Sequence, residues 1–310
     1  MPLPPAYTVA LCTHNHVSRL ERTLADLWRI ESPEAAWELL FIDNGCTDGT
    51  PAILARQQWP ADWSVRVVRE EKLGLSNARN RAIREALGEY VIFIDDDETP
   101  NPGWLREYER LIRDHKPDAF GGRIDVLFED ARPAWLSDEL LGFLGQLRRD
   151  DKVVQLTRRD TSFHGGNFGL RKAVCETAGL FDSMLGRRGG DNTGGEEVDF
   201  YRRLLDHGFR VFWAPHAVIF HRIEAAKLSR GYFLDLHYHQ GRVEAIRQRA
   251  AGSRIPPKYL IPQLWRALCA TIRQWHEEGG HAIVRKQMNV AYFAGYILGW
   301  AFGDRPEAGR

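Results

Sequence analysis

The chain has 310 residues, of which 44% are apolar and 27% charged, and it carries as many basic as acidic side chains. This composition is ordinary for a soluble globular protein, with room for one large α/β domain or a domain with an appendage. The four cysteines form no C-x-x-C pair, so neither a zinc site nor a disulfide framework is expected. The sequence shows no signal peptide and no run of about 18 uncharged apolar residues, so we expect a cytoplasmic, reducing location.

Charge is distributed unevenly along the chain. Residues 1–221 hold 28 basic and 35 acidic side chains, a net charge of −7, whereas residues 222–310 hold 14 and 7, a net charge of +7. The basic end fits either an anionic partner, such as lipid head groups, or the solvated face of basic helices. We expect no nucleic-acid partner.

Strand-like and helix-like segments alternate through the first hundred residues. The expected strands cover residues 7–12, 39–42, 65–68 and 91–94, and the helices between them cover 19–30, 51–58 and 76–87. This order predicts an α/β fold with a mostly parallel sheet covered by helices. Ligands of such sheets collect at the carboxyl ends of the strands, where the polar segments 13–16, 43–50 and 95–98 lie.

The remaining elements are less regular. Two prolines at residues 99–102 predict a turn, and a helix at 104–115 and a bent strand at 119–128 follow. Residues 129–160 are charged and irregular. A helix is expected at 196–207, and two short strands at 209–213 and 217–220. From residue 224 the pattern is helical and basic, with interruptions at Pro256, Pro257 and Pro262.

Four consecutive acids, residues 95–98, follow the apolar strand at 91–94. Carboxylates this close repel one another and resist removal from water. A cation at the cluster would relieve that repulsion, and oxygen ligands favour Mg²⁺ or Mn²⁺, which is often shared with substrate phosphates. The cluster therefore indicates a metal site that holds a phosphorylated substrate; the alternative is a solvated acidic turn.

Seven short motifs occur in order across about residues 7–222. They are ALCTHN at 10–15, IDNGCTDGT at 42–50, GLSNARN at 74–80, FIDDDE at 93–98, GGNFGLR at 165–171, GEEVD at 195–199 with Arg202, and His221. Each is weak alone, but together they resemble the inverting family-2 glycosyltransferases. The resemblance implies a GT-A catalytic domain at 1–222, followed by a helical, basic extension at 223–310.

The resemblance assigns roles within the acidic run. It implies that Asp97 ligates the metal, that Asp95 contacts the nucleotide ribose or the metal shell, and that Asp96 lies in the donor-nucleotide site. The metal would be Mn²⁺ or Mg²⁺ and would act as a Lewis acid on the leaving diphosphate. His221 would complete the metal or diphosphate shell, although a lone His is often structural.

Further residues of the donor nucleotide site follow from the same resemblance. Thr13 and Asn15 would line it. Asp43 would accept a hydrogen bond from the base, as suits the imide N–H of uracil, or else cap its turn. Arg79 would reach the base or the diphosphate, or else be a surface arginine.

The donor sugar and the acceptor are assigned to two other motifs. Gly166 and Asn167 would lie beside the donor sugar, or else form a structural bend. Glu197 would be the base that takes the acceptor proton, with Glu196 as runner-up, since family members usually have Glu-Asp here. The alternative is that acids in the first helical turn only favour the helix dipole. The glycine-rich residues 187–195 would form a loop that orders on substrate binding.

The predicted activity is transfer of a sugar, with inversion, from a nucleoside diphosphate sugar, best a UDP-sugar, to a hydroxyl of a glycan or lipid-linked saccharide. Two alternatives remain open: a nucleotidyltransferase that makes a sugar nucleotide, and a non-catalytic binding module for nucleotide sugars or glycans. The apolar aromatic run at 291–302 would pack in the core, form a homodimer face, or lie at a membrane surface as a peripheral contact.

Overall fold

The computed structural model describes residues 4–186, 195–250, 252–253, 255–278 and 284–302. They fall into two compact units. The first unit comprises the described residues up to Leu127 together with Gly145–Arg222, and the second comprises Phe128–Leu144 and the described residues from Ile223 onward. Residues 128–144, which the sequence analysis assigned to the catalytic domain, thus belong with the C-terminal unit. The predicted loop at 187–195 lies outside the described residues, apart from Gly195.

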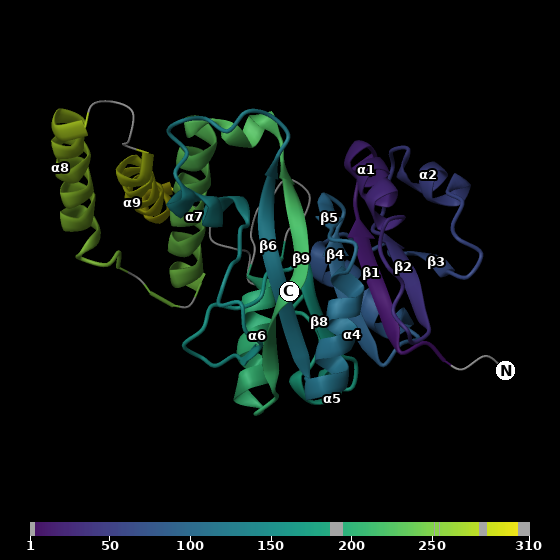
Figure 1. Cartoon of the computed structure of the whole chain (residues 1–310). Helices are drawn as coiled ribbons and strands as arrows, with labels where there is room; N and C mark the ends of the chain where they lie inside the picture. Colours follow the sequence, from purple (N-terminus) through teal and green to yellow (C-terminus); the bar gives the residue numbers. More distant parts are fainter. Residues whose placement is uncertain (1–3, 187–194, 251, 254, 279–283, 303–310) are drawn as a thin grey trace. The chain divides into compact units, whose positions relative to one another are not determined.

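The first unit is built on a mixed sheet in the order β3-β2-β1-β4-β8-β6-β9-β5, with β7 paired to β9 (Figure 1). Its strands are β1 Tyr7–Thr13, β2 Trp37–Asp43, β3 Ser64–Arg69, β4 Tyr90–Asp95, β5 Glu98–Pro100, β6 Ala119–Phe128, β7 Val154–Gln155, β8 Asn167–Arg171 and β9 Val211–Ile223. The neighbours among β3, β2, β1 and β4 are parallel, whereas β8 runs antiparallel to β4 and β6. The α/β class is confirmed, and the pairs among β3, β2, β1 and β4 form the parallel part of the sheet.

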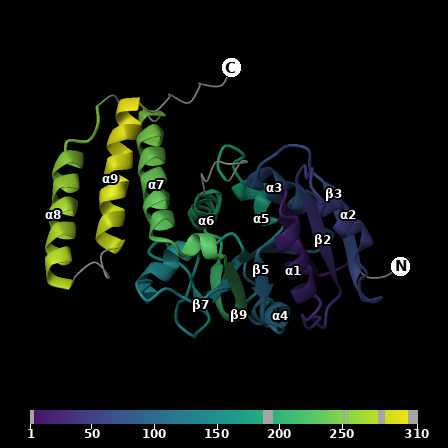
Figure 2. The same cartoon turned by 90° about the horizontal axis from the view of Figure 1, so that it is seen from above.

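Helices cover both faces of this sheet. Figure 2 shows α3 (Leu75–Glu85), α5 (Val174–Ala178) and α6 (Glu196–Asp206) on one side, with α1 (Val17–Leu27) and α4 (Trp104–His115) on the other. The short helix α2 (Thr50–Arg56) joins β2 to β3. Because β1 and β2 are buried along their whole length, both faces of their apolar runs are covered, as is usual for parallel sheets.

The strand register brings the polar segments to one edge. Thr13 stands opposite Asp43 on β2, and Cys12 stands opposite Asp95 on β4. The order of strands reverses at this point, because β1 leads to β2 on one side and adjoins β4 on the other. Such a switch point opens a crevice at the carboxyl ends of the strands, which is where ligands bind in open α/β sheets.

Two local expectations are wrong, and a third is right only in part. Glu98–Pro100 is a strand paired antiparallel to β9, and the expected turn follows it at 101–104, where Trp104 N donates to Asn101 O at 2.9 Å. The two short strands expected at 209–220 are a single strand, β9, because Pro215 is accommodated next to the exposed His216. Pro262 does not break a helix but lies in the first turn of α8, where a proline removes no helical hydrogen bond.

The second unit consists mainly of three helices, α7 (Arg230–Ala250), α8 (Leu260–Glu278) and α9 (Val284–Phe302). The 3₁₀ helices η1 (Asp138–Leu144) and η2 (Ala225–Leu228) also belong to it. Figure 2 shows α9 between α7 and α8. Ala245, Leu260 and Tyr296, one residue from each helix, form its small buried cluster. Within the described residues, no helix is both long and apolar enough to cross a membrane.

Candidate active site

The end of β1 is tied to the acidic turn. Thr13 Oγ1 donates to Asp96 Oδ2 at 2.6 Å, and His16 Nδ1 lies 3.2 Å from both Asp96 carboxylate oxygens. This hydrogen bond raises the pKa of His16, so the histidine carries positive charge to higher pH. Asp96 is buried and points toward β1. The prediction that Thr13 and Asp96 lie together at the nucleotide site stays untested, but their side chains do meet.

Asp97 faces the last strand of the sheet. β9 pairs with β5 so that His221 stands opposite Glu98, and His221 Nε2 lies 3.4 Å from Asp97 Oδ2. A backbone hydrogen bond from Arg222 N to Asp97 O holds the turn against β9. In the part of the chain that the structure describes, no group of three or more His, Cys, Asp or Glu side chains is arranged for a metal ion. Of the three predicted metal ligands, Asp97 and His221 are the pair in direct contact.

Glu98 is the acid that the structure removes from water. Its carboxyl is buried, and Oε2 accepts a hydrogen bond from Asp95 N at 3.0 Å. Burial, followed by the charges of Asp95 and Asp97, raises the pKa of Glu98 well above its ordinary value. The glycine at position 166 allows this arrangement, since a Cβ there would lie 2.0 Å from Glu98 Oε1. Glu98 is thus not a solvated group of the acidic turn but a buried one that contacts the backbone of Asp95.

Arg79 is a buried arginine that joins two acidic motifs. Nη1 donates to Glu196 Oε1 at 2.7 Å, and Nη2 donates to Gly165 O at 2.9 Å and lies 3.5 Å from Asp95 Oδ1. The guanidinium also stacks against Phe168 and Phe181. The surface alternative for Arg79 is therefore wrong. The contact expected with the base or diphosphate stays a prediction, and the contacts that the structure shows for this guanidinium lie inside the protein.

Glu196 and Glu197 begin α6. Glu196 is buried against Arg79, whereas Glu197 is largely buried, and the Oε2 atom of each has no hydrogen-bond partner in the described part of the chain. Burial, with the neighbouring Glu196 carboxylate as the second cause, raises the pKa of Glu197 to about 7. The two acids thus differ: Glu196 forms an ion pair with Arg79, while the pKa of Glu197 allows proton exchange near neutral pH. A carboxyl group with a pKa near 7 can accept and release a proton in neutral solution, as a general base must.

The end of β2 combines turn chemistry with an ion pair. Asp43 Oδ1 accepts from Cys46 N at 2.8 Å, and Oδ2 accepts from Arg69 Nη1 at 2.9 Å. Asp43 therefore caps its turn, the alternative considered for it, and it also binds Arg69 from β3. Asn15, at a positive φ of 52°, uses Oδ1 to accept from Thr47 N at 2.8 Å. Both predicted nucleotide residues thus lie in loops that their own hydrogen bonds shape.

Asn167 is a structural residue. Its Oδ1 accepts from Trp104 Nε1 at 2.8 Å and from Tyr108 Oη at 2.6 Å, and its Nδ2 donates to the carbonyl oxygens of Arg123 and Ala217. These bonds leave the amide no group for a donor sugar, so the structure corrects that expectation in favour of a structural role. Gly166 remains next to the acidic turn through its contact with Glu98.

Sequence reasoning did not single out two charged residues of this site. His16 reaches Asp96, and Arg69 reaches Asp43. His16 lies within the polar segment after β1, so its position at a strand end was a usable signal. Arg69 ends β3 directly opposite Asp43, which only the strand register reveals.

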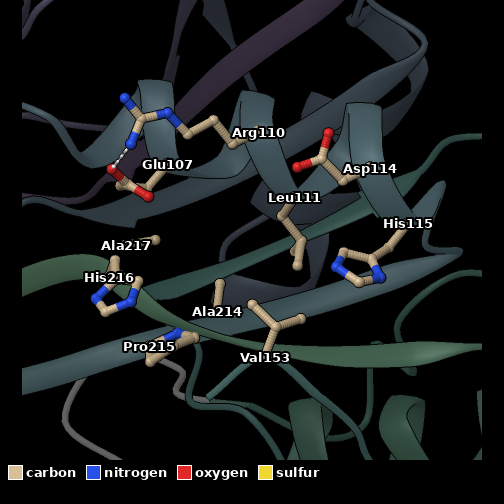
Figure 3. Close-up of a pocket in the computed structure, with 10 residues that line it drawn as sticks. All are labelled: Glu107, Arg110, Leu111, Asp114, His115, Val153, Ala214, Pro215, His216 and Ala217. Carbon is tan, nitrogen blue, oxygen red and sulfur yellow. Dashed lines mark hydrogen bonds and ion pairs between the residues drawn. The ribbon is translucent and has the colours of Figure 1, made fainter. Parts of the chain in front are cut away.

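An open cavity lies elsewhere in the first unit. Figure 3 shows it between α4 and β9, and its lining residues are Glu107, Arg110, Leu111, Asp114, His115, Val153, Ala214, Pro215, His216 and Ala217. Glu107 and Arg110 pair with each other across 2.7 Å rather than pointing polar groups into the space. None of the predicted site residues lines it, so we place the candidate active site at the strand ends instead.

Comparison with known proteins agrees with this geometry. The model of the family "Glycosyl transferase family 2" matches residues 8–179, more than half of the chain. The chain belongs to this family. The predicted family membership is thereby confirmed, and with it the glycosyltransferase class of the protein.

The relatives and structural neighbours of this family 2 member are distant. Glycosyltransferase AglE of Haloferax volcanii is 24% identical over 215 residues, covering 69% of this chain and 66% of AglE. Succinoglycan biosynthesis protein ExoM of Rhizobium meliloti is 22% identical over 275 residues, covering 85% and 82%. Mannosyltransferase PcManGT of Pyrobaculum calidifontis, solved in complex with GDP-Man and Mn²⁺, superimposes with a TM-score of 0.62 at 18% identity, covering 98% of this chain and 89% of PcManGT. The GT-A fold is confirmed by such neighbours, which also include Staphylococcus aureus TarS with UDP-GlcNAc, at a TM-score of 0.53 and 14% identity, covering 94% of this chain and 90% of the TarS chain.

Proposed function

We propose that the protein transfers a sugar, with inversion and with the help of a divalent metal, from a nucleoside diphosphate sugar to a hydroxyl group. The observation that carries this proposal is the Arg79 bridge. One buried guanidinium contacts Asp95, at the end of β4, and Glu196, beside Glu197 on α6. It thereby links the donor end of the site to an acid with a pKa of about 7. A nucleotide-binding sheet alone would not need that second acid.

The residues of the acidic turn fit a divalent cation. Asp97 and His221 approach within 3.4 Å, a carboxylate and an imidazole that suit Mn²⁺. Burial, followed by the charges of Asp95 and Asp97, raises the pKa of Glu98, so negative charge gathers at this turn. Asp97, His221 and Asp95 would hold the metal, which when bound supplies a Lewis acid for the departing diphosphate.

Glu197 is the proposed general base. Inversion requires a carboxylate that removes the acceptor proton while the leaving group departs from the opposite face of the sugar. Burial, followed by the charge of Glu196, raises the pKa of Glu197 to about 7, where a base is most useful in neutral solution. Glu196, already engaged in an ion pair, is the weaker candidate.

The donor is proposed to be a UDP-sugar, with a GDP-sugar as the competing choice. Asp43 at the end of β2 and Asn15 at the end of β1 lie in the loops proposed to bind the base. PcManGT was solved with GDP-Man and TarS with UDP-GlcNAc, so donors of both nucleotides occur among proteins of this fold. The acceptor is proposed to be a hydroxyl of a glycan or lipid-linked saccharide, in keeping with the succinoglycan role in the name of ExoM.

A donor panel tests the proposal. The full chain is incubated with UDP- and GDP-sugars and Mn²⁺ or Mg²⁺, and the released nucleotide is measured with and without saccharide acceptors. We expect UDP release that EDTA abolishes, and a fall of about a hundredfold or more for Asp97→Asn, with Asp114→Asn on the surface of α4 as the matched control. In a separate arm with UTP or GTP and sugar 1-phosphates, pyrophosphate release would instead identify a nucleotidyltransferase. Donor binding without turnover by any donor, metal and acceptor would identify a binding module.

A further inference from the structure

Arg222 is a buried arginine that follows His221 on β9. Its Nη2 donates to Asp26 Oδ2 on α1 at 2.9 Å, and both Nη atoms donate to Thr23 Oγ1, at 3.2 and 3.3 Å. Thr99 Oγ1, on β5, donates to the same Asp26 oxygen at 2.7 Å. Figures 1 and 2 show β5 between β9 and α1. These hydrogen bonds therefore join three elements that meet at the acidic turn.

The same residues hold the backbone of the acidic turn. Thr23 Oγ1 donates to Asp96 O at 2.8 Å, Arg222 N donates to Asp97 O at 3.2 Å, and Arg222 Nη2 donates to Glu98 O at 3.3 Å. Two residues thus bind three consecutive carbonyl oxygens. Because those peptide groups are fixed, the directions in which the side chains leave the turn are fixed with them.

His221 is confined by the same arrangement. Arg222 N belongs to the peptide group that follows His221, so its hydrogen bond to Asp97 O ties the backbone of His221 to the turn. The imidazole lies between two neighbours: Nε2 is 3.4 Å from Asp97 Oδ2, and a Cβ added to Gly145 would lie 2.8 Å from Nδ1. Gly145 has a φ of 90°, which favours glycine there. The ring is therefore held facing Asp97.

Asp26 balances the charge of Arg222. A guanidinium is always protonated in proteins, and the carboxylate of Asp26 accepts directly from it. Arg222 binds the turn through backbone oxygens, whereas Arg79 lies 3.5 Å from a carboxylate oxygen of Asp95. The pair of Arg222 and Asp26 therefore holds the turn in place and adds no net charge to it. The negative charge of the turn stays available to a bound cation.

We propose that Arg222 is a positioning residue of the metal site, since it fixes both the turn that carries Asp97 and the strand that carries His221. It acts through the backbone and is not itself a ligand. The inference rests on the proposed function, which assigns the divalent metal to these side chains. Residues that orient metal ligands typically contribute about 10–100-fold to metal affinity, so the loss of Arg222 has a measurable consequence.

Titration of the full chain with Mn²⁺, followed by the electron paramagnetic resonance signal of the free ion, tests the inference. It is run with Mn²⁺ alone and with UDP or GDP added. We expect Arg222→Gln to weaken Mn²⁺ binding by about 10–100-fold. Arg66→Gln is the matched control, because Arg66 donates to the buried Glu38 at 3.0 Å, toward the amino end of β2. The control removes a comparable ion pair and is expected to change Mn²⁺ affinity by less than about twofold.

Two further variants separate geometry from charge. Arg222→Lys keeps the charge but loses the fork of donors, so we expect Mn²⁺ binding to be about tenfold weaker. This variant carries the test if Arg222→Gln does not fold. Asp26→Asn leaves the guanidinium charge unbalanced beside the turn and should weaken binding about fivefold. Added to Arg222→Gln, it should change binding by less than about twofold, because no cation is left to balance.

Far-UV circular dichroism checks that each variant is folded. The inference alone is overturned if folded Arg222→Gln or Arg222→Lys binds Mn²⁺ as tightly as wild type, or if Arg66→Gln loses as much affinity as they do. A wild type that binds no Mn²⁺, or binds it no better than Asp97→Asn, contradicts the metal site of the proposed function and overturns the inference with it.

Discussion

Two acidic groups of this protein, at the β4–β5 turn and at the start of α6, look alike in sequence but are used differently. In the turn, four acids are distributed among separate partners: Asp96 to Thr13, Asp97 to His221, Asp95 to Arg79, and Glu98 to the interior. At the start of α6, Glu196 forms an ion pair with Arg79, whereas burial raises the pKa of Glu197 to about 7. The comparison teaches that the partner of a carboxylate, rather than its place in a run of acids, decides what it can do.

The largest expected effect comes from removing the proposed base. Glu197→Gln keeps the shape of the side chain but cannot take a proton, so we expect the transfer rate to fall by about 10²–10⁴-fold. Initial rates with the donor found in the panel measure this change. Glu139→Gln, an exposed acid of η1, is the matched control. Near wild-type activity in Glu197→Gln would assign the base to another residue.

Removing the bridge is expected to affect stability most. Arg79→Gln leaves Glu196 buried without its cation, which costs about 3–5 kcal/mol of unfolding free energy. Denaturant unfolding monitored by circular dichroism measures the loss. In the double variant, with Glu196→Gln added, most of that stability should return, because no buried charge is left unpaired. If the double variant is no more stable than Arg79→Gln, the ion pair is not what Arg79 contributes.

The raised pKa of Glu197 predicts that activity and folding stability change with pH in opposite directions. Activity needs the carboxylate, so kcat/KM should rise with pH through about 7. Between about pH 4.5 and 7, Glu197 keeps its proton in the folded protein but loses it in the unfolded chain. The free energy of unfolding therefore falls as the pH rises through this range. Glu197→Gln should therefore be more stable than wild type at pH 8, by about 3 kcal/mol at most, and nearly equal at pH 4.5. Melting curves in EDTA at both pH values test the sign.

The smallest effect is expected at Glu98. Burial and the charges of Asp95 and Asp97 raise the pKa of Glu98 well above its ordinary value, which favours the uncharged form that glutamine mimics, and glutamine can still accept from Asp95 N. Glu98→Gln should change the unfolding free energy at pH 7 by less than about 1 kcal/mol. Asp96→Asn, which disturbs charged contacts with Thr13 and His16, should cost more, about 1–3 kcal/mol. Equal losses in the two variants would contradict the division of roles within the turn.

Much of the fold could be predicted from local pattern. The helix at Trp104–His115 and the strand at Ala119–Phe128 have the predicted bounds, since their apolar spacing is clear. The β5 strand could not be predicted, because two prolines read as a turn and only pairing with β9 makes an extended segment favourable. The site was predictable as a set of motifs, but not the partners of its charges. Arg79 was predicted to reach the nucleotide or else to lie on the surface, and only tertiary packing places it against Phe168 and Phe181 and beside Glu196.

The amino-acid sequence by itself determined the family, the α/β class and the positions of the polar segments at strand ends, because these follow from local periodicity and short motifs. The tertiary structure decided which acid is paired, which is buried and which has a pKa near 7. Charge state and burial depend on neighbours that are distant in sequence, such as Glu196 for Arg79 or Asp26 for Arg222, and no local pattern records those neighbours.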